Sequence, residues 1–178
     1  LLMDNNGTMA FKVEKSNTVK GVTAGVMILL VVVFAPIFFF SADGPETLIV
    51  SVVIAVAVFG SIFGLYLMMP RRIELTADAI VVRRVAGKKV LPYADIYEAE
   101  AWSGWPHALL RTCGSGALFG YIGWFAGGGL GRHYEYVGRY SQAFYIKLRS
   151  GRPYMLSCQE RDKVLERINM NIKKDNEA

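Results

Sequence analysis

Two long uncharged segments occupy most of the first 70 residues, and they constrain the fold more than any other feature of the chain. Residues 21–42 and residues 47–70 contain no charged side chain, and both are dense in Val, Ile, Leu and Phe. A helix needs about 20 apolar residues to cross a hydrocarbon core of about 30 Å. A buried helix of a soluble protein is usually shorter and carries a polar stripe. The two segments therefore predict a hairpin of two transmembrane helices.

The charges around this hairpin predict its orientation. The basic residues closest to the two segments all lie outside the connecting loop: Lys12, Lys15, Lys20, Arg71 and Arg72. The only charged residues in the loop itself are Asp43 and Glu46. Because basic residues beside transmembrane helices mark the cytoplasmic side, we expect both chain termini in the cytoplasm.

Within the two segments, the side chains argue against transport. Neither segment contains Asp, Glu, Lys, Arg or His, whereas such residues inside a membrane usually mark ion or proton paths. Gly60 and Gly64 have the spacing that allows close helix contact. This pair fits either contact between the two helices of one chain or a dimer interface.

The remaining residues, 71–178, predict a separate α+β domain. They carry 17 basic and 11 acidic residues, whereas residues 1–70 carry three and four, so the basic character belongs to this domain. Alternating apolar residues and turn signals predict seven short strands, at 73–75, 80–82, 89–91, 97–102, 133–140, 143–148 and 153–157. Apolar residues at helical spacing then predict a helix over 158–173, with Ser157 and Glu160 as its capping box.

Two stretches, residues 73–96 and residues 115–125, together with the order of the elements, resemble a bacterial pleckstrin-homology-like (PH-like) domain. Such domains often follow a pair of transmembrane helices, and the resemblance covers residues 12–174. It implies a seven-stranded barrel or sandwich, closed by the C-terminal helix, and it implies no reaction. The expected organisation is a cytoplasmic segment (1–20), a membrane hairpin (21–70, with helices at about 21–42 and 47–70) and a cytoplasmic PH-like domain (71–178).

One departure from lipid-binding eukaryotic PH domains concerns the first strand turn. Those domains place basic residues around this turn to hold inositol phosphates. Here the turn is Thr76-Ala77-Asp78, and the basic residues Arg83, Arg84, Lys88 and Lys89 lie one hairpin later. Phosphoinositide recognition is therefore not expected.

A glycine-rich aromatic segment, residues 113–131, is the most unusual part of this domain. It has eight glycines and no charge between Arg111 and Arg132, and it matches neither a dinucleotide-binding fingerprint nor a phosphate loop. Its aromatic residues either pack into the domain core or form a contact surface for lipid headgroups or a protein partner. For the second alternative, the candidate contact residues are Arg111, Phe119, Tyr121, Trp124, Phe125 and Arg132.

Residue types that carry chemistry are sparse and scattered. His107 and His133 lie 26 residues apart, without the spacing of a metal site, and Cys113 and Cys158 allow at most one disulfide. No nucleophile has a base beside it in a known spacing. We therefore expect no metal, no cofactor and no enzymatic activity.

These observations lead to one functional hypothesis and one alternative. The first is a membrane-anchored, non-enzymatic binding or scaffolding module of the bacterial cytoplasmic (inner) membrane, whose PH-like domain recognises a protein partner or the membrane surface. The alternative is a subunit of a membrane protein assembly, in which the hairpin makes the main contacts and the domain regulates. Expected partners are the lipid bilayer and a protein partner or a second copy of the chain. No nucleic acid is expected, because basic residues beside a membrane more often serve lipid contact and topology.

Overall fold

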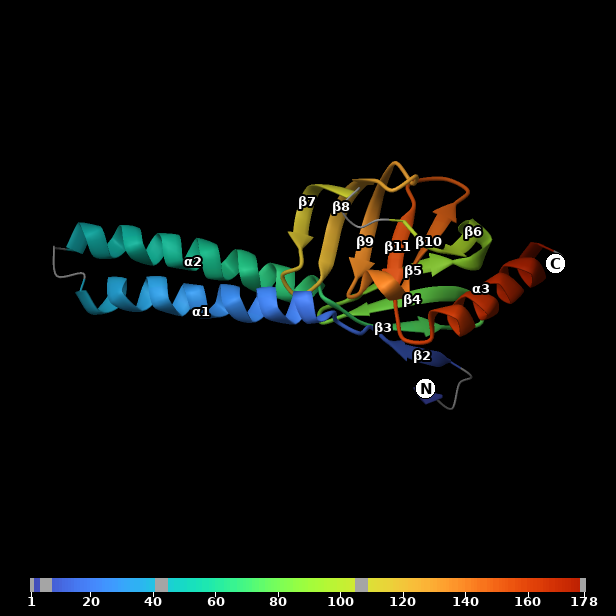
Figure 1. Cartoon of the computed structure of the whole chain (residues 1–178), viewed down its shortest axis with the longest axis horizontal. Helices are drawn as coiled ribbons and strands as arrows, with labels where there is room; N and C mark the ends of the chain where they lie inside the picture. Colours follow the sequence, from blue (N-terminus) through green and yellow to red (C-terminus); the bar gives the residue numbers. More distant parts are fainter. Residues whose placement is uncertain (1, 4–7, 41–44, 105–108, 177–178) are drawn as a thin grey trace.

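Two long helices project from one end of a strand-rich domain (Figure 1). The computed structural model describes residues 2–3, 8–40, 45–104 and 109–176. Helix α1 spans Asn17–Phe40 and helix α2 spans Pro45–Met68. Helix α1 thus begins four residues before the predicted segment, and α2 ends two residues before Pro70. Asp43, in the predicted loop, lies outside the described residues.

Both helices have the length and composition needed to cross a membrane, and almost none of their residues are buried. The spans Asn17–Pro36 and Leu48–Met68 have mean hydropathies of 2.2 and 2.7, and 6% of each most apolar stretch is buried. Large apolar side chains such as Val31 and Val56 are 65% and 67% exposed. A core helix of a soluble protein would bury these side chains, so the helices fit a membrane-associated protein.

Gly60 and Gly64 do not lie against the other helix. A Cβ atom added at either glycine would meet no atom within 4 Å, and both residues are exposed. The interpretation that this pair mediates contact between the two helices of one chain is therefore wrong. An aromatic contact occurs elsewhere, where the rings of Phe34 and Phe59 approach to 5.4 Å.

The first sheet is antiparallel and has the strand order β1-β2-β3-β4-β5. Its strands are β1 (Leu2–Met3), β2 (Met9–Lys12), β3 (Pro70–Leu75), β4 (Ala79–Arg84) and β5 (Lys88–Pro92). Strand β2 precedes the helices and pairs with β3, which follows them. The sheet therefore contains residues from both sides of the helical hairpin.

The second sheet has the order β6-β10-β11-β9-β8-β7. Its strands are β6 (Ile96–Ala101), β7 (Leu109–Gly116), β8 (Tyr121–Gly127), β9 (Arg132–Val137), β10 (Ala143–Leu148) and β11 (Tyr154–Ser157). All neighbours are antiparallel except β9 and β11, which are parallel. Short 3₁₀ helices, η1 (Tyr93–Asp95) and η3 (Tyr140–Gln142), precede β6 and β10.

The seven predicted strands correspond to β3–β6 and β9–β11, but the described residues form eleven strands. The predicted number is wrong because four strands lack a clear sequence pattern. Strands β1 and β2 contain two and four residues, too few for an alternation to be recognised. Strands β7 and β8 lie in the glycine-rich segment, and glycine has low β propensity.

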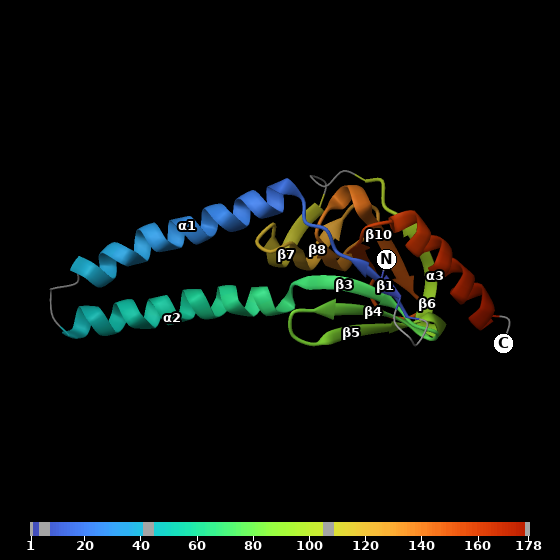
Figure 2. The same cartoon turned by 90° about the horizontal axis from the view of Figure 1, so that it is seen from below.

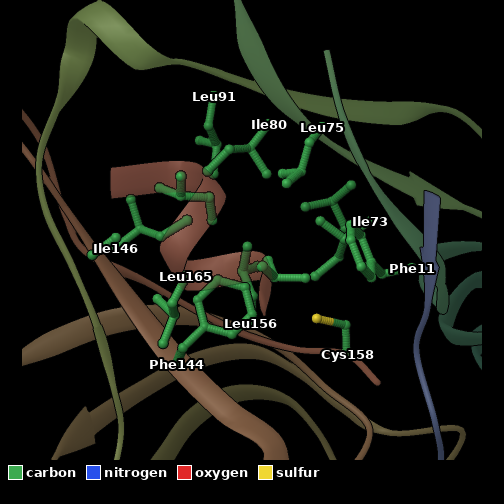
Figure 3. Close-up of a cluster of buried hydrophobic side chains, with 14 of the residues drawn as sticks. Phe11, Ile73, Leu75, Ile80, Leu91, Phe144, Ile146, Leu156, Cys158 and Leu165 are labelled. Carbon is green, nitrogen blue, oxygen red and sulfur yellow. The ribbon is translucent and has the colours of Figure 1, made fainter. Parts of the chain in front are cut away.

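The main core lies between the two sheets and the C-terminal helix α3 (Arg161–Asn176), which lies against β6 and η1. Figure 3 shows side chains from all three layers converging. Leu165 of α3 and Phe11 of β2 both belong to this cluster. The fully buried members include Ile73, Ile80, Val82, Ile96, Phe144, Ile146, Leu156, Val164 and Ile168.

Helix α3 does not begin with the predicted capping box. Ser157 is the last residue of β11, and its hydroxyl oxygen accepts hydrogen bonds from the backbone N–H groups of Gly138 and Arg139 (2.8 and 3.4 Å). That hydroxyl is therefore engaged inside the sheet, and the helix starts four residues later, at Arg161. The predicted helix itself is confirmed, and its apolar residues face the core.

The helices are tied to the domain at one end, which we call the helix-proximal end (Figure 2). The Val13 N–H donates a hydrogen bond to the Arg71 carbonyl (3.0 Å), and the Ala86 N–H donates to the Leu67 carbonyl (2.9 Å). The Ser16 N–H donates to the carbonyl of Gly138, which directly follows β9 of the second sheet (2.9 Å). The Ser16 hydroxyl also accepts from the Val19 N–H (3.2 Å), as an N-cap of α1 does. Both sheets thus hold the helix ends.

Candidate functional site

The turn of the β7–β8 hairpin contacts both helices. The Phe119 N–H donates a hydrogen bond to Oγ1 of Thr23 in α1 (3.0 Å), and the Phe119 ring lies edge-on to Tyr66 of α2 (centroids 5.5 Å apart). Phe119 has φ of 61°, a left-handed conformation that is strained for a bulky residue. The two helix contacts offset this strain. In both overall views β7 is the strand of its sheet nearest to the helices.

The candidate aromatic residues of this hairpin do not form one surface. Side chains alternate between the two faces of a strand, so Tyr121 and Phe125 share one face of β8 and Trp124 lies on the other. Phe125 is buried, and Tyr121 packs on Tyr140 with ring centroids 4.4 Å apart. Phe119 packs on α2 as described above. Residues of the segment thus pack both within the domain and against the helices.

Trp124 and its basic neighbours remain accessible. The indole ring is half-buried against Tyr134 (centroids 5.0 Å apart), and the guanidinium groups of Arg132 and Arg152 lie over it at 5.3 and 5.1 Å. Arg111 and Arg132 are exposed. Their role in binding lipid or a partner stays a prediction.

Two glycines of the hairpin are required by a close approach of the strands. Gly114 and Gly123 face each other with φ of 120° and 129°. A Cβ at Gly123 would lie 2.2 Å from the Cys113 carbonyl oxygen, and one at Gly114 would lie 2.1 Å from that of Ile122. No side chain fits there. In the register with β9, Gly123 also lies opposite Glu135.

Glu135 belongs to a buried polar cluster that the sequence analysis missed. Its carboxylate contacts Nε2 of His133 (3.0 Å) and accepts a hydrogen bond from the Tyr140 hydroxyl (2.7 Å), and His133 Nδ1 lies 2.9 Å from the Gly131 carbonyl oxygen. His133 and Glu135 are both fully buried. The sequence did contain a signal for this cluster, because Glu135 lies on the same face of its strand as His133 and Val137.

The environment of His133 favours its charged form. Burial lowers the pKa of His133, but the hydrogen bonds to Glu135 and Gly131, together with the charge of Glu135, outweigh burial and raise the pKa above its ordinary value. For Tyr140, burial and the Glu135 charge raise the pKa, so the phenol stays protonated and donates. His133 and Glu135 bond to internal partners and are closed to solvent, which is typical of a structural role.

A basic pocket lies at the helix-proximal end. It is a cavity of about 580 Å³ between β2, β3, β4 and the β11–α3 connection. Its lining residues are Ala10, Phe11, Lys12, Arg71, Arg72, Arg83, Arg84, Gln159 and Glu160. Five of these nine residues are basic and one is acidic, so the pocket is suited to an anion.

The strand register explains why these cations converge. Lys12 of β2 pairs with Arg72 of β3, which pairs with Arg83 of β4, so three cations form a row across the sheet. Like charges directly opposite each other destabilise a sheet. The buried carboxylate of Glu74 partly offsets this row, because it forms salt bridges with Arg72 and Arg83 (2.7 Å each).

Positive charge remains in excess after these pairings. Within the described part of the chain, Nε of Arg84 is buried and has no hydrogen-bond partner. The acidic lining residue, Glu160, is engaged by Lys163, and this hydrogen bond lowers the pKa of Glu160. Beside the pocket, partial burial and then the charge of Arg71 lower the pKa of Lys15. In the sequence, Lys12, Lys15, Arg71 and Arg72 served as markers of topology, and Arg83 and Arg84 were noted only as lying one hairpin after the first strand turn.

The described residues give no other candidate for chemistry. No three His, Cys, Asp or Glu side chains among them are grouped as a metal site would require. Cys113 is exposed, Cys158 is buried, and both are free thiols; burial raises the pKa of Cys158 to about 12. His107 lies outside the described residues.

Comparison with known proteins supports the resemblance noted from the sequence. A family model described as "Bacterial PH domain" matches residues 71–172, more than half of the chain. The searches of curated proteins and of solved structures gave no match. The matched residues run from the first arginine after α2 to the last buried residue of α3.

Proposed function

Since the chain belongs to the bacterial PH domain family, we propose that it is a membrane-anchored, non-enzymatic binding module of the bacterial cytoplasmic membrane. In this proposal the helical hairpin spans the bilayer with both termini in the cytoplasm. The PH-like domain then lies at the cytoplasmic surface, where it binds a protein partner or the membrane itself.

The observation that carries this proposal is the attachment of the domain to the ends of two exposed apolar helices. Backbone hydrogen bonds join residue 67 to residue 86, residue 69 to residue 85, and residue 71 to residue 13. In addition, Phe119 contacts both helices. A domain joined to the helices by a single flexible linker would sample many orientations. Attachment through both sheets supports one fixed orientation, with the helix-proximal end toward the bilayer.

The absence of catalysis is part of the same proposal. The candidate acid–base pair, His133 and Glu135, is fully buried, and its polar atoms bond to each other and to Gly131 and Tyr140. A catalytic acid or base must come within hydrogen-bond reach of a substrate. This burial favours a binding role for the domain.

The runner-up is a subunit of a membrane protein assembly in which the hairpin makes the main contacts. It is favoured by the exposure of Phe59 and Phe63 on α2 (43% and 60%) and of Gly60 and Gly64 beside them. Small residues at this spacing allow another helix to approach closely. In that case protein partners would bind the hairpin and not the PH-like domain.

A reporter fusion tests the topology. A reporter that is active only in the cytoplasm should be active when fused after the C-terminus. Activity of a reporter that requires the periplasm, at the same position, would contradict the proposal. A fusion placed in the connecting loop serves as the opposite control.

An exchange of hairpins separates the two functional alternatives. The hairpin is replaced by an unrelated two-helix hairpin of equal length, and the proteins that co-purify with the chimera are compared with those of the original chain. Partners kept by the chimera support the binding module. Partners lost by the chimera, but kept by a chain that lacks residues 73–176, support the assembly subunit.

A further inference from the structure

We infer that the basic pocket at the helix-proximal end binds the phosphate group of an anionic membrane lipid. This inference rests on the proposed membrane anchoring and adds a ligand class and a binding site to it. The site lies at the opposite end of β3 and β4 from the turn Thr76–Asp78, so it is distinct from the turn used by eukaryotic phosphoinositide-binding PH domains.

The first argument is the position of the pocket along the helix axis. The apolar span of α2 ends at Met68, and Arg71 follows three residues later in extended chain. An extended chain advances about 3.3 Å per residue, so Arg71 lies at most about 10 Å beyond the end of the span. The headgroup layer extends roughly 5–8 Å beyond the hydrocarbon core on each side. Arg71, which lines the pocket, therefore lies close enough to the end of the span to reach the headgroup layer.

The second argument is the chemistry of the lining residues. Four of the five cations are arginines, whose planar guanidinium groups donate paired hydrogen bonds to phosphate oxygens. Arg72 and Arg83 share the carboxylate of Glu74, which fixes their orientation. Within the described part of the chain, Lys12, Arg71 and Arg84 form no ion pair with an acidic side chain. They supply the charge available to a ligand.

The positive charge of the pocket is also incompletely compensated by the protein itself. A row of like charges on three neighbouring strands is unfavourable, and Nε of Arg84 is buried without a hydrogen-bond partner in the described structure. A buried donor without an acceptor is rare in native structures. A phosphate in the pocket would reduce the charge repulsion and provide acceptor oxygens at the same time.

Native mass spectrometry of the full chain in detergent tests the inference. The protein is mixed with phosphatidylglycerol and with phosphatidylcholine of identical acyl chains, and the lipid-bound fractions are compared. We expect preferential retention of phosphatidylglycerol. The substitutions Arg71→Gln and Arg84→Gln should each weaken it about fivefold, since one basic residue near an anionic surface contributes about that factor.

The matched control is Arg167→Gln. Arg167 is exposed on α3, which lies against β6 and η1, and it does not line the pocket. This variant should retain phosphatidylglycerol as the original chain does. If Arg71→Gln or Arg84→Gln lowers the thermal unfolding midpoint, Lys12→Gln, at an exposed position of the same pocket, replaces it in the comparison.

Several results would overturn the inference. These are equal retention of the two lipids, or a loss in the Arg71 and Arg84 variants no greater than in the Arg167 variant. Binding of glycerol 3-phosphate or inorganic phosphate without preference for the anionic lipid would assign the pocket to a soluble anion instead. Because lipid retention in detergent does not depend on topology, a negative result here leaves the membrane anchoring intact. Failure of the reporter experiment, in turn, would contradict the anchoring itself.

Discussion

At the scale of single residues, the buried pair of His133 and Glu135 is the most consequential feature of the domain. Burial of two opposite charges costs solvation energy, and their contact repays it only while both partners are present. The raised pKa of His133 means that the folded state binds its proton more tightly than the unfolded state does. The resulting stabilisation is complete below the unfolded pKa of about 6.5 and is lost as the pH rises through the higher folded pKa.

We predict that Glu135→Gln destabilises the protein by about 3–5 kcal/mol near pH 6, the range for breaking a buried ion pair. The pH dependence above pH 6.5 should also disappear, because the carboxylate that raises the pKa of His133 is gone. Urea unfolding of the full chain in mild detergent, followed by tryptophan fluorescence, measures both effects. Glu166→Gln, at an exposed position of α3, should change stability by less than about 0.5 kcal/mol. An unchanged pH profile in Glu135→Gln would refute this account.

Individual side chains also mark the limit of prediction from sequence. Ser157 and Glu160 match a capping box, yet the Ser157 hydroxyl bonds to Gly138 and Arg139, which are remote in sequence. As a charged residue, Glu135 would be expected on the surface, but the fold places it beside His133 and Tyr140. In both cases the partner that decides the role is brought close only by tertiary structure.

At the scale of elements, periodicity was informative wherever apolar residues repeat. Helix α3 was predicted because its apolar residues recur at helical spacing. The two long helices were predicted because each uncharged apolar segment is long enough to cross a bilayer. Strands β7 and β8 were missed, since glycines occupy positions where an alternating pattern would be visible. Their pairing depends on the close approach at Gly114 and Gly123, which leaves no hydrophobic signal.

We predict that Leu165→Ala destabilises the domain by about 2–5 kcal/mol, as large-to-small changes in a core do. Leu165 is 8% exposed and packs in the main core, whereas Met170 on the same helix is 47% exposed. Met170→Ala should therefore change the unfolding free energy by less than about 0.5 kcal/mol. Equal effects of the two substitutions would show that α3 does not close the core.

At the scale of the whole molecule, the domain and the hairpin are interleaved in sequence. Strand β2 contributes Phe11 to the main core and pairs with β3, although the two helices separate them in the chain. The basic pocket also depends on this arrangement, because its cations come from β2, β3 and β4. Each basic residue is visible in the sequence, but their convergence requires the strand register.

We predict that a fragment of residues 71–176 is much less stable than one that includes β2. Joining residues 8–14 to residues 69–176 through a short Gly/Ser linker should restore stability, because the Val13 N–H bonds to the Arg71 carbonyl and the joined ends are close. Loss of Phe11 alone should cost about 3–5 kcal/mol. Urea unfolding of the two soluble fragments, and of the joined fragment with Phe11→Ala, provides the comparison. Equal midpoints for the two fragments would mean that β2 is dispensable.

The pairing of β2 with β3 also orders events during biosynthesis. Lys12 and Arg72 are register partners but lie 60 residues apart. At a ribosomal rate of about 5–20 residues per second, β3 is therefore synthesised roughly 3–12 seconds after β2. During that interval the nascent chain delivers both apolar helices. Strands β2 and β3 can pair only after the second helix has left the ribosome. The domain therefore completes its folding only after the whole hairpin has been synthesised.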